Sequence, residues 1–207
     1  ASYISHLDTM RTFQRVFPRA ELHLKHSNGF HPHPIISIVL PLPVGQSSDC
    51  ELLDFETVEE TDGAGIAEKL NTGLPAGLRV RECYPVTRPV REFTFLRARL
   101  ELLYDNGVPA GTADALRALF ARETLMIEKR TKHKELAQID IAPLIREMTL
   151  TEQDGSILAD AVVAAQNPGL NPAYLAQAIE RELPSLKPDF VRVRRTEIYD
   201  TEGNVFR

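Results

Sequence analysis

The sequence has no tryptophan, only two cysteines and no long apolar run, and these absences exclude several classes of protein. Cys50 and Cys83 form no C-x-x-C pair among the 207 residues, which argues against a cysteine-based zinc site, a redox motif or an iron–sulfur cluster. No apolar stretch approaches the roughly 20 residues of a membrane span. We therefore expect a soluble protein of the reducing cytoplasm, without membrane contact and without a cofactor of its own.

Several catalytic motifs are missing as well. The phosphate loop G-x-x-x-x-G-K-[ST], the dinucleotide motif G-x-G-x-x-G, the hydrolase elbow G-x-S-x-G and the zinc-protease motif H-E-x-x-H are all absent. The chain starts with Ala1 and not with Met, and no secretory leader is visible. The length predicts one large domain or two small ones.

Charge is distributed unevenly along the chain, although the net charge is only −5. Residues 49–68 contain eight acidic side chains and no Lys or Arg, whereas residues 129–134 are basic without an acid. Both signs therefore form local patches, and the mean charge does not argue against an anionic partner.

Hydrophobic periodicity and turn residues predict alternating helices and strands in both halves. In the first half we expect helices at 6–18 and 63–74, and strands at 21–25, 35–42, 53–58 and 78–86. In the second half we expect helices at 112–122 and 172–183, and strands at 93–104, 125–129, 136–141, 157–165 and 190–198.

This element order predicts an α+β protein made of two tandem ferredoxin-like units, each a split βαβ arrangement. We place the first unit at residues 1–88 and the second at residues 89–207. The first unit lacks an opening strand, which we expect before residue 4.

Histidine is concentrated at the start of the chain, where five of the six histidines lie within the first 33 residues. His6 is expected to begin a helix, whose free N–H groups favour an anion. His33 follows a turn and lies between two prolines. Two imidazoles with Asp8 suit general acid–base catalysis or metal ligation. The alternative is structural, with Ser5 and Asp8 as helix caps and the histidines bonded to backbone.

Basic side chains form a second candidate site, in two segments. On an extended strand Arg192 and Arg194 share a face, and such rows follow the phosphates of single-stranded nucleic acid. The alternative is a solvated hairpin tip and a sheet face of mixed charge. The candidate nucleic-acid-binding residues are Lys129, Arg130, Lys132, Lys134, Arg192, Arg194 and Arg195.

Six segments together resemble the radical-SAM-associated bacterial domain of unknown function. They are residues 4–11 (ISHLDTMR), 27–37 (SNGFHPHPIIS), 41–45 (PLPVG), 74–80 (LPAGLRV), 140–145 (DIAPLI) and 193–196 (VRRT). Domains of this family are fused to radical SAM proteins or encoded beside them. The family pattern has Asn at the position of His31 and no histidine at positions 23 and 26. Only His6 and His33 of the clustered histidines therefore match it.

The resemblance implies an accessory module that binds RNA or another substrate for a radical SAM enzyme, in RNA modification. The iron–sulfur cluster and S-adenosylmethionine would belong to that partner. We take the first two motifs as the binding site, with Ser5, His6, Asp8, Arg11, Ser27, Asn28, Gly29, Phe30 and His33.

Two other functions remain open at this stage. The first is a ribonuclease-like acid–base enzyme using His6 and His33, because tandem ferredoxin-like units also form CRISPR RNA-processing endoribonucleases, although their glycine-rich C-terminal loop is absent here. The second is a protein-interaction domain that docks through the acidic segment 49–68.

Overall fold

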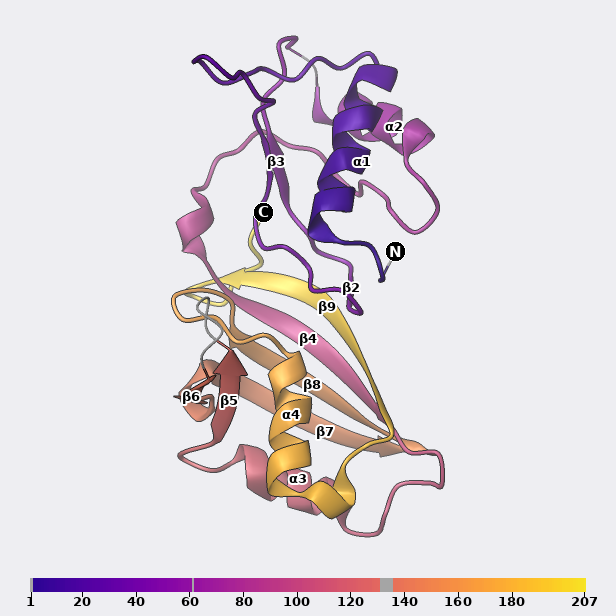
Figure 1. The fold of residues 1–207 in the computed structure, drawn as a ribbon, viewed down its shortest axis with the longest axis vertical. Helices are drawn as coiled ribbons and strands as arrows, with labels where there is room; N and C mark the ends of the chain where they lie inside the picture. The colour runs from indigo at the N-terminus through magenta and orange to yellow at the C-terminus, as the bar shows by residue number, and fades with distance from the viewer. Residues whose placement is uncertain (1, 61, 131–135) are drawn as a thin grey trace. The chain divides into compact units, whose positions relative to one another are not determined.

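The chain is an α+β protein that divides into two compact units, residues 1–90 (unit 1) and 91–207 (unit 2) (Figure 1). The computed structural model describes residues 2–60, 62–130 and 136–207. Within these ranges, no helix has both the length and the apolar character needed to cross a membrane.

Unit 1 packs two helices, α1 (His6–Arg19) and α2 (Gly63–Gly73), against a small antiparallel strand pair. The pair is formed by β1 (Ile36–Ile38) and β3 (Leu53–Phe55), and the two-residue β2 (Ser47–Ser48) lies between them in the sequence. The ring of Phe17 meets that of Phe55 edge-on at 4.8 Å. The buried core of unit 1 contains Val16, Phe17, Leu22, Leu24, Ile66 and Leu70.

Two of the strands expected in unit 1 are not formed. Residues 78–86 are irregular, because the amide side chain of Asn71 occupies both backbone groups of Val80 and so replaces the ladder of a strand. Residues 21–25 are reduced to an isolated bridge between Leu24 and Thr57. Glu21 has a φ of 57°, in the left-handed region, so the chain turns there and does not extend.

Unit 2 is a four-stranded antiparallel sheet with two helices on the same side (Figure 1). Its strands are β4 (Phe93–Leu103), β7 (Ile145–Gln153), β8 (Ser156–Ala164) and β9 (Phe190–Asp200), and the spatial order is β9-β4-β8-β7. The helices are α3 (Thr112–Phe120) and α4 (Ala173–Glu182). Short 3-10 helices cover Val90–Glu92, Ala142–Leu144 and Pro184–Leu186.

The sequence pattern does not indicate the outer strand of this sheet. The expected strands at 125–129 and 136–141 are formed, but β5 (Met126–Arg130) and β6 (Leu136–Asp140) pair with each other in a separate two-stranded sheet. The outer position of the four-stranded sheet is held by β7, which was not predicted. As the outer strand, β7 is exposed along most of its length, so its sequence has no regular apolar alternation.

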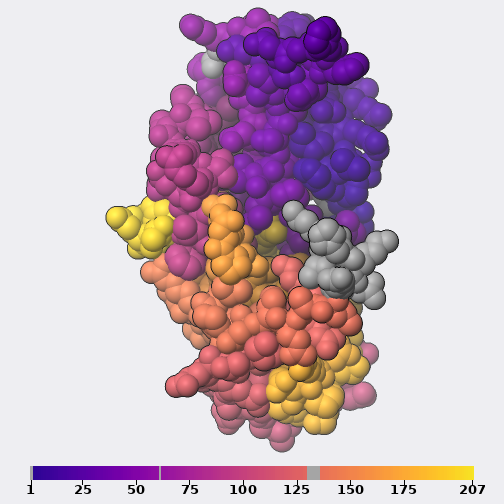
Figure 2. All heavy atoms as spheres, turned by 60° about the vertical axis from the view of Figure 1, so that its left-hand side comes forward, coloured from indigo at the N-terminus to yellow at the C-terminus, as the bar shows by residue number. Residues whose placement is uncertain are grey.

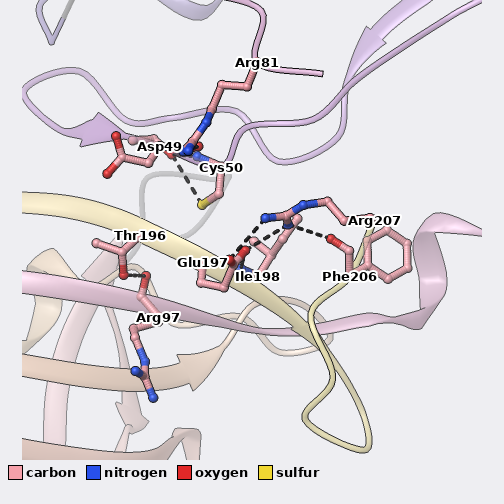
Figure 3. Close-up of polar contacts among 10 residues, drawn as sticks. Asp49, Cys50, Arg81, Arg97, Thr196, Glu197, Ile198, Phe206 and Arg207 are labelled. Carbon is pink, nitrogen blue, oxygen red and sulfur yellow. Dashed lines mark hydrogen bonds and ion pairs between the residues drawn. The ribbon is translucent and has the colours of Figure 1, made fainter. Parts of the chain in front are cut away.

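The residues after β9 fold back onto unit 2. Val205 bridges Tyr199, and the buried ring of Phe206 lies 6.1 Å from that of Phe93. The guanidinium of Arg207 binds both carboxylate oxygens of Glu197, at 2.8 and 3.1 Å (Figure 3). The turn at 201–204 between these contacts is exposed, and the yellow C-terminal residues lie at the surface in Figure 2.

Candidate functional site

The first turn of α1 is held by its own cap. The Ser5 hydroxyl oxygen accepts a hydrogen bond from the Asp8 N–H at 3.1 Å, and the hydroxyl donates to the Asp8 carboxylate at 2.6 Å. That hydrogen bond, followed by the charge of Arg11 at 3.3 Å, holds the pKa of Asp8 below its ordinary value. Ser5, Asp8 and Arg11 therefore form the helix cap. The neighbouring His6 is exposed and, within the described residues, has no hydrogen-bond or ion-pair partner.

The second histidine motif forms a tight turn with an ordered stem. The Ser27 N–H donates to the His33 carbonyl at 2.9 Å, and the His33 N–H donates to the Ser27 hydroxyl at 3.2 Å. The Ser27 hydroxyl also lies 2.8 Å from Nδ1 of His33. Gly29 has a φ of 138°, which a side chain would strain. Phe30 is fully exposed, and the exposed Asn28 lies beside Gly29.

His6 and His33 are not brought together. α1 has 14 residues, which makes it about 21 Å long. Its start lies near Gly45, whose N–H donates to the Ser2 carbonyl at 2.7 Å. Its last turns join the core beside Leu22, and the chain then leads into the turn. In Figure 1 α1 begins close to the N label, and the segment after it lies at the other end of unit 1.

This separation does not favour the joint chemical roles considered for the two histidines. A joint acid–base pair needs both groups within reach of one substrate atom. The described residues also contain no group of three His, Cys, Asp or Glu side chains that could hold a metal ion, so His6, His33 and Asp8 do not form the ligand set considered above.

Three acidic side chains of segment 49–68 make contacts within unit 1. Glu59 bonds the imidazole and the backbone N–H of His23, and the bond to the imidazole is the main reason why the pKa of Glu59 lies below its ordinary value. Glu56 pairs with Lys25 at 3.5 Å. Asp62 caps α2 by accepting from the Gly65 N–H at 2.6 Å.

The basic candidates in the second unit come from two segments, residues 129–134 and strand β9. In the first segment, Lys132 and Lys134 lie outside the described residues, and Arg130 is the last residue of β5. The ammonium of Lys129 lies 5.9 Å above the ring of Tyr174. The remaining candidates, Arg192, Arg194 and Arg195, lie on β9.

Arg195 does not share the surface of its two neighbours. Arg192 and Arg194 are exposed, whereas Arg195 is buried, with 4% of its surface accessible. The alternation of a strand explains the difference, because Arg195 pairs with the buried Ala98 and so points to the other side of the sheet. The prediction that Arg195 contributes to a nucleic-acid surface is therefore not supported.

Two further arginines, on β4, join Arg192 and Arg194. Along β4 the side chains of Leu96, Leu100 and Leu102 are buried, so Arg97 and Arg99 lie on the opposite face, turned away from the helices. The register places Arg99 directly across from Arg194. Like charges in such a pair are unfavourable on their own. This cluster of Arg97, Arg99, Arg192 and Arg194 is called the arginine face below.

Acidic side chains are interleaved with the arginine face. Arg192 pairs with Glu101 at 3.0 Å, and Asp160 lies 3.5 Å from both Arg97 and Arg99. The guanidinium groups stay accessible, since the Arg192 and Arg99 side chains are 65% and 52% exposed. Ion pairs at that exposure contribute about 0–1 kcal/mol, so an anionic ligand can displace them at low cost.

Two aromatic rings continue the same face. Phe95 pairs across the strands with Tyr199. The guanidinium of Arg97 lies 5.8 Å from the centre of the Tyr199 ring, and that of Arg146 lies 4.7 Å from the Phe95 ring. The hydroxyl of Thr196 donates to the Arg97 carbonyl at 3.4 Å and ties β9 to β4 beside the cluster (Figure 3). The face thus combines planar rings with bidentate donors.

Sequence reasoning found only part of this face. It indicated Arg192 and Arg194 from their spacing on one strand. It did not connect them with Phe95 or Arg146, because these two residues join the cluster only through the pairing of β4 with β9 and with β8, which in turn pairs with β7. A pocket of about 290 Å³ lies between α3 and β7, and its lining includes Arg117, Phe120, Arg146 and Met148.

The comparison with known families gives one result. A family model described as an uncharacterized protein conserved in bacteria (DUF2344) matches residues 1–172. The match includes unit 1 and the strands β4 to β8, and it ends before α4 and β9. No curated protein matches the sequence. Because the match covers most of the 207 residues, the chain belongs to this bacterial family, DUF2344.

Proposed function

We propose that this chain is an RNA-binding accessory module that serves a radical SAM enzyme. The observation that carries the RNA-binding part is the arginine face of unit 2, with Phe95 and Tyr199 beside it. Single-stranded nucleic acid is bound by surfaces on which cationic groups follow the phosphates and aromatic rings stack on bases. Guanidinium groups suit phosphate because their planar fork donates two parallel hydrogen bonds.

The strand order of unit 2 supports this proposal. If β4, β7, β8 and β9 are numbered in sequence order, the sheet runs fourth, first, third, second, and every neighbouring pair is antiparallel. We propose on this basis that unit 2 is a ferredoxin-like split βαβ unit. RNA-recognition domains of four strands bind RNA on the sheet face that carries no helices. The arginine face is the corresponding face here, and this analogy is one of fold alone.

The connection to radical SAM chemistry rests on the sequence motifs at residues 4–11 and 27–37. In this proposal the partner enzyme supplies the iron–sulfur cluster and S-adenosylmethionine, and this chain supplies substrate binding. We propose neither an acid–base enzyme nor an acidic docking module, because His6 and His33 lie apart and no contact among the described residues of segment 49–68 points to a protein partner.

RNA binding is tested by the salt dependence of affinity. The full chain is titrated with a single-stranded oligoribonucleotide at several salt concentrations, and the slope of log affinity against log salt is measured. We expect the double variant R99Q/R194Q to lower the magnitude of that slope by about 0.7 for each phosphate that the variant no longer neutralises.

The matched control is R122Q/R181Q, which removes the same charge from two arginines that pair with Glu182 on the helix side of unit 2. We expect this variant to bind as the wild type does. Absence of binding at low salt, or equal losses of affinity in both variants, would contradict RNA binding on the arginine face.

The partner is tested with a radical SAM protein of the same bacterium. The two proteins are co-expressed, and the complex is purified through a tag on this chain. We expect a stoichiometric complex with the absorbance and electron paramagnetic resonance of an iron–sulfur cluster. If the two proteins elute separately, the accessory role is wrong even if the chain binds RNA.

A further inference from the structure

The turn at residues 27–33 presents an aromatic ring that unit 1 does not use. Phe30 lies at its tip with its whole side chain exposed. A single exposed apolar residue is common on protein surfaces and needs no explanation by itself. What distinguishes Phe30 is the ordered backbone that holds it and the hydrogen-bond donors beside it.

The stem of the turn is fixed by hydrogen bonds on both sides. His26 bridges Pro34, and the Ile35 N–H donates to the Lys25 carbonyl at 2.8 Å. The mutual bonds of Ser27 and His33 close the turn at 2.8 to 3.2 Å. Binding of a ligand at the tip therefore costs little conformational entropy, because the loop is already ordered.

The same turn engages one nitrogen of the His33 ring. Nδ1 lies 2.8 Å from the Ser27 hydroxyl and 3.5 Å from the His31 carbonyl oxygen. When the Ser27 hydroxyl donates to Nδ1, the neutral imidazole carries its proton at Nε2. His33 is exposed, so Nε2 is the ring nitrogen that is left for an external acceptor near Phe30.

The segment around the tip of the turn contains a basic side chain and histidines but no carboxylate. No Asp or Glu occurs from Leu22 to Ser48, whereas Lys25 and four histidines do. The acids that reach the stem are Glu56 and Glu59, which pair with Lys25 and His23 at its base. The tip thus offers donors and an aromatic face without a carboxylate, which suits a flat ligand rich in acceptors and attached to an anion.

We propose that Phe30 stacks on a base of single-stranded RNA while His33 donates from Nε2 to an acceptor of the same nucleotide. This proposal rests on the proposed RNA-binding function and places a second, base-dependent contact in unit 1. Stacking of a base on an aromatic side chain contributes about 1–3 kcal/mol. The contact depends on the ring and is independent of the arginine face.

The test compares a ligand that has bases with one that has none. The full chain is titrated with single-stranded oligouridylate and, separately, with inorganic polyphosphate. We expect F30A to weaken binding of oligouridylate about tenfold, which corresponds to 1.4 kcal/mol, and to leave binding of polyphosphate unchanged. The variant F30W keeps an aromatic face, so we expect it to bind oligouridylate as tightly as the wild type.

The control is V58A, which truncates another exposed apolar side chain of unit 1 and is expected to bind both ligands normally. Wild-type affinity of F30A for oligouridylate, or an equal loss for polyphosphate, overturns base stacking. If the wild type does not bind oligouridylate at all, base stacking and the proposed function both fail. If F30A behaves as expected but R99Q/R194Q binds normally, only the arginine face is wrong.

Discussion

Asn71 is bonded to Val80 through both of its side-chain polar groups. The amide nitrogen donates to the Val80 carbonyl at 2.8 Å, and the amide oxygen accepts from the Val80 N–H at 2.9 Å. The last turns of α2 thereby hold an extended segment that has no strand partner. This contact satisfies both backbone groups of Val80 outside any sheet.

We expect N71A to destabilise unit 1, because both backbone groups of Val80 lose their partner in a half-buried position. The expected loss is about 1–3 kcal/mol of unfolding free energy, measured by urea denaturation. The variant N71D keeps the acceptor but sets a carboxylate against the Val80 carbonyl, so it should not restore stability. The control T72A changes the next, exposed residue and should cost less than N71A; equal losses would contradict this role of Asn71.

Gly63, the first residue of α2, has no room for a side chain. A Cβ atom there would overlap the carbonyl oxygen of Cys83, so either α2 or the segment around Cys83 would have to move. We expect G63A to cost about 1–3 kcal/mol, as for an overpacked core, in thermal or urea unfolding. A64S adds one atom at the next, exposed position of the same turn and should be close to neutral. A G63A variant as stable as A64S would show that the contact relaxes without cost.

Tyr104 should ionise only at high pH. Its burial, with a smaller effect of the Asp189 charge, raises the pKa of Tyr104 from 10 to about 12, and its hydroxyl donates to the Leu186 carbonyl at 3.0 Å. Since the folded pKa lies above the unfolded one, the stabilising effect is complete below pH 10 and is lost as the pH rises towards 12.

The measurement is a titration of phenolate absorbance in the folded chain. We expect a late component that Y104F removes, and that variant should lose about 1 kcal/mol at neutral pH with the hydrogen bond. The control is Y3F, which changes an exposed tyrosine and should leave the late component in place. A titration of the folded chain in which Y104F removes an early component would contradict the raised pKa.

Much of the element order can be predicted from local sequence signals. The caps Ser5 and Asp62 mark the starts of α1 and α2, where the first free N–H groups need an acceptor. The alternation along β4 and β9 likewise predicts two long strands. β7 could not be predicted in this way, because an outer strand buries little and has no regular apolar pattern. Residues 78–86 show the opposite case, in which an alternating pattern is overridden by the side chain of Asn71.

The candidate sites likewise have features that the sequence predicts and features that only the tertiary structure determines. The common face of Arg192 and Arg194 and the turn at 27–33 could both be predicted from the sequence alone. Each follows from local backbone geometry: the alternation of a strand in the first case, and the Gly and Pro residues in the second. Only the tertiary structure decided that Arg99 lies across from Arg194, that Arg195 is buried, and that α1 separates His6 from the turn. Strand partners, register and the direction of a packed helix depend on contacts between residues far apart in the chain, and a local pattern does not contain them.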